Sequence, residues 1–80
     1  MHIRLVAYGI ARDILGAREM QYEAHAGDTV ADLKQRLITE YPAFSKLAGL
    51  AFAIGEEYVP DLRKLKADDE VIVLPPVSGG

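Results

Sequence analysis

Residues 27–42 read GDTVADLKQRLITEYP, and this stretch decides the fold. Its apolar residues recur at the spacing of one helix face: Val30, Leu33, Leu37 and Tyr41. Thr29 or Asp28 can cap the first turn, because a short polar side chain accepts from the unpaired backbone N–H groups there. Asp32 stands where a capping box places its acid, and Pro42 cannot continue the helix. The stretch therefore predicts one long helix with an apolar face that a sheet must cover.

Strand-like segments lie on both sides of this helix. Ile3, Leu5 and Ala7 alternate with Arg4, Val6 and Tyr8 at the period of a strand. Residues 19–24 alternate as an edge strand that pairs with the first. After the helix, residues 51–54 form a weak strand signal and a turn leads to Tyr58 and Val59. Residues 70–74 are nearly all apolar and β-branched, which is typical of a central strand buried on both faces.

Shorter segments complete the chain. A turn of helix is expected at residues 10–15 and another within 44–50, while residues 61–65 are expected to form one helical turn and 67–69 a charged turn. The order is therefore β-β-α-β-β, an α+β fold with a mixed sheet and one main helix on one face.

Length and composition exclude several functions. Eighty residues predict a single domain over 1–80, and the formal net charge of −3 argues against nucleic-acid binding. The lack of cysteine excludes disulfides, a thiolate nucleophile and cysteine metal sites. No apolar run reaches the ~20 residues of a membrane span, and no signal-peptide pattern precedes the first strand, so a cytoplasmic location is expected.

No metal or cofactor site is expected on the chain. His2 and His25 have no partner at ligand spacing, and residues 68–70 are three acids that more often face solvent than hold a divalent cation. Arg12 could contact a partner or cap its loop. The sequence also contains no phosphate-binding loop and no triad motif, so nucleotide binding is left to a partner.

The chain closes on a tail, residues 75–80, with a distinctive composition. Its residues are Pro75, Pro76, Val77, Ser78, Gly79 and Gly80. The prolines stop the strand and the glycines remove side chains, so the tail can reach about 20 Å into a narrow channel. A terminal carboxylate is ionised at neutral pH and is a poor electrophile, but ATP could convert it to an acyl-adenylate that a nucleophile attacks. These features favour a chain that carries a chemical group on Gly80.

The same residues resemble a known family. Residues 69–80, DEVIVLPPVSGG, look like the end of the small subunits of molybdopterin synthase, which close on Pro-Pro-Val-(Ser/Thr)-Gly-Gly. Residues 8–16, YGIARDILG, are similar to the family's aromatic-x-x-x-Arg-(Glu/Asp)-x-x-Gly stretch, and residues 29–33 resemble its helix start. Many relatives have Asn after the third strand where this chain has Gly55, and both residues suit a tight turn.

The resemblance implies a ubiquitin-like β-grasp fold and a sulfur carrier in molybdenum cofactor biosynthesis. A ubiquitin-activating-like adenylyltransferase would use ATP to adenylate Gly80, and a sulfur donor protein would convert it to a thiocarboxylate. The tail would then supply sulfur to cyclic pyranopterin monophosphate inside the large subunit, in a heterotetramer of two small and two large subunits. The chain alone would be non-catalytic and would act as a sulfurtransferase subunit only in the complex.

The partner interface is predicted on the sheet face away from the helix. If Val71 and Val73 face the helix, Leu74 points to the opposite face, and alternation along the first strand places Tyr8 there too. With Tyr58, these residues would form an apolar patch for the large subunit, or else a loosely covered minor core.

Three other functions share some of these features. A sulfur carrier for the thiazole of thiamine has the same fold and Gly-Gly end, but is typically shorter and lacks the Pro-Pro-Val entry. A ubiquitin-like modifier would join Gly80 to lysine amines. A plain interaction domain would have an inert tail.

Overall fold

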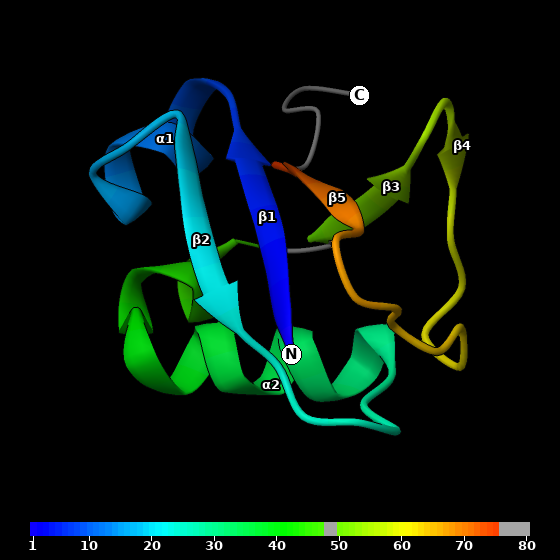
Figure 1. Cartoon of the computed structure of the whole chain (residues 1–80). Helices are drawn as coiled ribbons and strands as arrows, with labels where there is room; N and C mark the ends of the chain where they lie inside the picture. Colours follow the sequence, from blue (N-terminus) through cyan, green and yellow to red (C-terminus); the bar gives the residue numbers. More distant parts are fainter. Residues whose placement is uncertain (48–49, 76–80) are drawn as a thin grey trace.

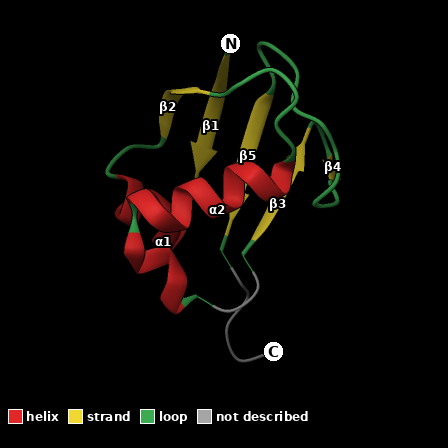
Figure 2. Ribbon diagram, turned by 90° about the horizontal axis from the view of Figure 1, so that it is seen from below, coloured by secondary structure: helices red, strands yellow, loops and turns green. Residues whose placement is uncertain are grey.

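The computed structural model describes residues 1–47 and 50–75 (Figure 1). Its elements in chain order are β1 (His2–Ala7), α1 (Gly9–Leu15), β2 (Glu19–Glu23), α2 (Val30–Glu40), the 3-10 helix η1 (Pro42–Lys46), β3 (Ala51–Ile54), β4 (Glu57–Tyr58) and β5 (Glu70–Leu74). The five strands form one sheet in the order β2-β1-β5-β3-β4. Both α-helices lie on the same side of this sheet, as the view in Figure 2 shows. The predicted α+β arrangement is confirmed, with β4 as an additional short strand.

The middle of the sheet is a parallel pair. β5 lies between β1, to which it is parallel, and β3, to which it is antiparallel. Val73 therefore stands opposite Ala7 on one side and Phe52 on the other, and all three side chains are buried. This explains the nearly continuous apolar sequence of β5, since a strand with neighbours on both sides has little contact with water.

The core lies between the sheet and α2. Val30, Leu33 and Leu37 of α2 are fully buried, as their spacing predicts. Tyr41, the last residue of the predicted apolar stripe, is only half-buried, because it lies at the C-cap, where α2 ends. Its ring packs edge-to-face with that of Phe44 at a centroid distance of 6.2 Å.

The start of α2 is held by two kinds of hydrogen bond. The Thr29 hydroxyl accepts from the Asp32 N–H at 3.3 Å, and the Asp32 carboxylate accepts from the Thr29 N–H at 2.9 Å, which is the predicted capping box. The next two N–H groups, of Val30 and Ala31, donate at 2.9 Å to carbonyl groups of the 61–65 segment.

The prediction of a helical turn at residues 61–65 is wrong. The carbonyls of Asp61 and Arg63 accept from the first turn of α2, so they are not available to a helix of their own. Lys64 forms an isolated bridge with Thr29, and the buried Leu65 donates its N–H to the Asp28 carbonyl at 2.8 Å. The segment is therefore a strap across the start of α2. It begins with a turn at Asp61 and Leu62, in which the Arg63 N–H donates to the Pro60 carbonyl at 3.1 Å.

The turn before Tyr58 and the charged turn at residues 67–69 form where the sequence predicts them. Gly55 begins the β3–β4 hairpin turn with φ 68°, a conformation that Gly adopts without strain. In the charged turn of residues 67–69, the Asp69 carboxylate accepts from the Lys66 N–H and from Arg63, both at 2.7 Å. Within the part of the chain that is described, no helix has the length and apolar character to cross a membrane.

Two polar contacts connect β2, at the edge of the sheet, and the loop after it to α2. The Tyr22 hydroxyl of β2 donates to the Glu40 carboxylate, and partial burial, followed by that carboxylate, raises the pKa of Tyr22 above its ordinary value. Arg36 donates to Asp28 at 3.0 Å, and both side chains are largely shielded from water. These contacts fasten β2 and the loop after it onto the helix.

We predict that Thr29→Ala lowers the free energy of unfolding by about 1 kcal/mol, because the N-cap acceptor is lost. Urea denaturation of both proteins measures the difference. Thr39→Ala is the matched control, since Thr39 is exposed within α2 and its hydroxyl bonds only to the Gln35 carbonyl. We expect a change within about 0.5 kcal/mol for that control. Equal effects of the two substitutions would contradict the capping role.

We predict that the stability contributed by Asp28 is lost in acid. A hydrogen bond from the His25 N–H and the nearby Arg36 favour the carboxylate, so they hold the pKa of Asp28 below its ordinary value of 3.8. This contribution is present above that ordinary value and disappears as the pH falls through the lower folded-state pKa. Asp28→Asn should therefore be less stable than the wild type at pH 7, and the gap should narrow toward pH 2. A gap that stays constant in denaturation series over this range would refute the linkage.

Candidate functional site

The tail leaves the sheet from its central strand. β5 ends at Leu74, and Pro75 is half-buried next to the β1–α1 junction, where a Cβ added to Gly9 would lie 4.0 Å from Pro75 Cγ. The predicted tail residues beyond this point lie outside the described residues: Pro76, Val77, Ser78, Gly79 and Gly80. The described structure thus places the origin of the tail at the end of a buried strand.

The sheet face opposite α2, here called the open face, carries side chains in register across all five strands. One row runs through residues that pair in sequence from strand to strand: Glu19, Val6, Ile72, Ala53 and Tyr58. One residue beyond the paired Ala7 and Val73, Tyr8 and Leu74 continue the same face. Tyr8 has an extended backbone, φ −132° and ψ 160°, so the alternation of β1 extends to it.

These side chains form an apolar half of the open face, next to the tail exit. It consists of Val6, Tyr8, Ala53, Tyr58, Ile72 and Leu74. Val6 and Ala53 are buried although they lie outside the main core, whereas Tyr8 is 51% and Tyr58 76% exposed. Leu74 is half-buried beside the exit, and Tyr58 lies on the β4 edge. The structure thus brings Tyr8 and Leu74 to the tail exit and places Tyr58 at the sheet edge; their role as an interface stays a prediction.

The other end of the open face is polar, and so is its β2 edge, where Glu19 stands beside Val6. This polar half consists of His2, Arg4, Glu19, Gln21, Glu23, Asp68 and Glu70. Arg4 pairs with Glu70 on the neighbouring strand and with Glu19 at 3.7 Å. His2 Nε2 lies 3.0 Å from the Glu23 carboxylate. The pairing of Arg4 with both neighbouring strands escaped the sequence reasoning, because it depends on the register of strands far apart in the chain.

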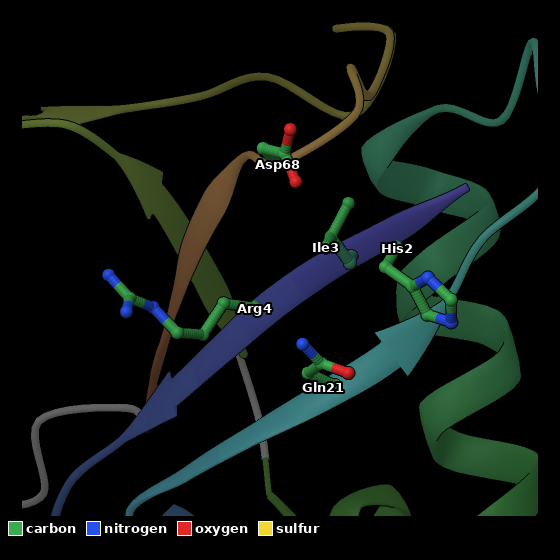
Figure 3. A pocket seen from close by; sticks show the side chains of 5 residues that line it. All are labelled: His2, Ile3, Arg4, Gln21 and Asp68. Atoms are coloured by element: carbon green, nitrogen blue, oxygen red, sulfur yellow. The ribbon is translucent and has the colours of Figure 1, made fainter.

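A shallow pocket of about 280 Å³ lies in the polar half. It is lined by His2, Ile3, Arg4, Gln21 and Asp68. Figure 3 shows Gln21 on β2, three of these residues on β1, and Asp68 on the turn that leads into β5. The Asp68 N–H donates to the His2 carbonyl at 2.8 Å, which holds the turn against the start of β1. The sequence reasoning did not identify this pocket.

The acids of residues 68–70 do not converge. Asp69 accepts from Arg63 and from the Lys66 N–H, Glu70 pairs with Arg4, and Asp68 lines the pocket. Within residues 1–47 and 50–75, no three His, Asp or Glu side chains gather as metal ligands. Arg12 is exposed on α1. The described residues therefore show an apolar part of the open face beside the origin of the tail.

Known proteins with similar sequences and structures belong to one group of small carrier and modifier proteins. The sequence model of the ThiS family matches residues 6–80. A molybdopterin synthase sulfur carrier subunit from Chlamydomonas reinhardtii is 35% identical over 83 residues, covering 100% of both chains. Among solved structures, the small archaeal modifier protein 1 of Haloferax volcanii superimposes with TM-score 0.79 at 20% identity, covering 95% of this chain and 98% of its own.

A complex of subunits 1 and 2 of the molybdopterin-converting factor from Helicobacter pylori contains another similar chain, with TM-score 0.66, 24% identity and 100% of both chains covered. At these identities the solved structures establish the ubiquitin-like β-grasp fold. The family match over nearly the whole chain and the full-length similarity to the Chlamydomonas protein establish the family. The chain therefore belongs to the ThiS family and to the family of molybdopterin synthase sulfur carrier subunits.

Proposed function

We propose that this protein carries sulfur for molybdopterin synthesis as a thiocarboxylate on Gly80. The Gly80 carboxylate attacks ATP bound to an activating adenylyltransferase, which yields the acyl-adenylate and releases pyrophosphate. A sulfur donor protein then supplies sulfur at the sulfide level, which attacks the same carbonyl carbon and displaces AMP. Within the large subunit, the thiocarboxylate sulfur attacks cyclic pyranopterin monophosphate and displaces an oxygen substituent, and water hydrolyses the resulting thioester, which leaves the sulfur on the pterin and returns Gly80 to a carboxylate. ATP is used by the activating enzyme, and the chain needs no cofactor of its own.

One observation carries this proposal: the Gly-Gly tail follows directly from the central strand of the sheet. Val71 and Val73 are fully buried and hydrogen-bonded strands lie on both sides of β5, so the origin of the tail is held rigidly. Pro75 continues from that strand beside Gly9. A rigid origin reduces the entropy that is lost when a tail enters an active site, which favours a carrier that presents its terminus to partner enzymes.

The apolar half of the open face supports docking to the large subunit. It lies next to the tail exit, so a partner seated there would receive the tail directly. Two exposed tyrosines, Tyr8 and Tyr58, supply the kind of side chain that dominates the energy of protein interfaces. The related chain from Helicobacter pylori has a structure in complex with subunit 2 of its converting factor. We infer the corresponding assembly for this chain, with two small and two large subunits.

A modifier role is the main alternative, since the Haloferax volcanii protein of similar fold is named as a modifier. Carrier and modifier share the adenylate at Gly80 and differ in the nucleophile that accepts the acyl group. A sulfur nucleophile yields the thiocarboxylate, whereas a lysine amine yields an isopeptide bond. The product at Gly80 therefore distinguishes the two functions.

We predict that Gly80 becomes a thiocarboxylate when the chain is incubated with ATP, the activating enzyme and a sulfur donor. Intact-mass measurement with fragmentation at the C-terminus should locate one sulfur in place of one oxygen on Gly80. A chain lacking Gly79 and Gly80 is the control and should stay unmodified. An unmodified full chain, under conditions that convert another carrier of the family, would contradict the proposal, and isopeptide conjugates through Gly80 would favour the modifier.

We predict that Tyr8→Ala and Leu74→Ala each weaken binding to the large subunit by about tenfold to a hundredfold, because both remove apolar contact beside the tail exit. Titration calorimetry measures the affinity, and chemical denaturation verifies that the variants are folded. Leu62→Ala is the matched control, since Leu62 is 83% exposed and lies outside the apolar half. Folded variants at Tyr8 and Leu74 that bind as tightly as the control would exclude this face as the interface.

A further inference from the structure

The charge of the chain is concentrated on the polar half of the open face. This half holds four carboxylates, Glu19, Glu23, Asp68 and Glu70, and one guanidinium, Arg4, so its formal charge is −3 while His2 is neutral. The whole chain also has a formal charge of −3. The remaining charges of the molecule therefore balance, and the negative field originates mainly from this one region.

The carboxylates of the polar half differ in how well they are compensated. Arg4 pairs with both Glu70 and Glu19, so one cation serves two acids. Among the described residues, the ion pair of the Glu23 carboxylate is with the imidazole of His2 at 3.0 Å, which compensates charge only when it is protonated. Asp68 is exposed at the rim of the pocket. The negative charge that is least compensated thus lies at Glu23 and Asp68, on either side of His2.

The pocket beside Asp68 has room for one long side chain. Its volume is about 280 Å³, and besides His2 and Ile3 it is lined by Asp68, Gln21 and Arg4, whose guanidinium is paired with Glu70 and Glu19. In Figure 3 these side chains surround the hollow from β1, β2 and the turn before β5. Oxygen acceptors beside a shallow pocket can bind a lysine or arginine side chain. The aliphatic stem of that side chain packs against the pocket wall, and its cationic head donates hydrogen bonds to the oxygens.

The polar and apolar halves are parts of one continuous surface. Val6 and Ile72 of the apolar half lie on the same strands as Arg4 and Glu70, two residues further along. A protein large enough to cover the apolar half and receive the tail would therefore also cover the polar half. Bringing four carboxylates under a partner without cationic groups would cost desolvation energy that nothing repays.

We propose, on the basis of the proposed function, that the large subunit docks with basic side chains over the polar half, one of which enters the pocket beside Asp68 while another approaches Glu23. The apolar half then supplies most of the contact area, and the polar half attracts and orients the partner before contact. Such charge pairs at the edge of an interface act mainly on the association rate and on its dependence on salt.

The test compares the wild type with Glu23→Gln/Asp68→Asn in stopped-flow association with the large subunit. Asn tolerates the left-handed backbone of Asp68, φ 66°, so the double variant removes two charges with little strain. Asp13→Asn/Asp61→Asn is the control, because it removes two exposed acids, one on α1 and one on the strap across the start of α2, and makes the same change in net charge.

At about 0.01 M ionic strength, we expect the variant in the polar half to associate about threefold to tenfold more slowly than the wild type. The control should stay within about twofold of the wild type. Raising the ionic strength to about 0.1 M should remove most of the difference, because the screening length shortens to about 10 Å. Equal rates and equal salt dependence for the two double variants would contradict this inference alone. Failure of the wild type to bind the large subunit at all would overturn the proposed function as well.

Discussion

The parallel pairing of β1 with β5 is the constraint on which the rest of the structure depends. It joins the two ends of the chain, with Leu5 opposite Val71 and Ala7 opposite Val73, all fully buried. A parallel pair requires a long connection, and here that connection contains α2, which covers one face of the sheet. Once this pair is formed, the alternation of side chains assigns every residue of β1 and β5 either to the core or to the open face.

The same pairing organises the functional surface. Because β1 and β5 run in the same direction, Tyr8 and Leu74 follow their strands at one end of the sheet, where Pro75 begins the tail. At the other end, Arg4 lies beside Glu70 and the start of β1 lies beside the turn of Asp68. One register thus separates an apolar half at the tail exit from a polar half at the far end. The proposed docking surface and the origin of the tail therefore lie at the same end of the sheet.

Much of the fold was predictable because it depends on local patterns. The capping box at Thr29 and Asp32, the apolar spacing of α2 and the β-branched run of β5 are each encoded within a few residues. The strap of residues 61–65 was predicted as a helical turn, because the sequence does not show that its carbonyls bond to the start of α2. Local propensity is weak over five residues, and a tertiary hydrogen bond overrides it.

The sequence by itself determined the order of the main elements, the central position of β5, the composition of the Gly-Gly tail and the face on which Tyr8 and Leu74 lie. Each of these follows from periodicity or from residue type along a short stretch. Only the tertiary structure decided which charges meet. The contacts of Arg4 with Glu70 and of His2 with Glu23, and the pocket beside Asp68, join residues that are distant in the chain. Their proximity depends on strand order and register, which pairing across the whole sheet establishes.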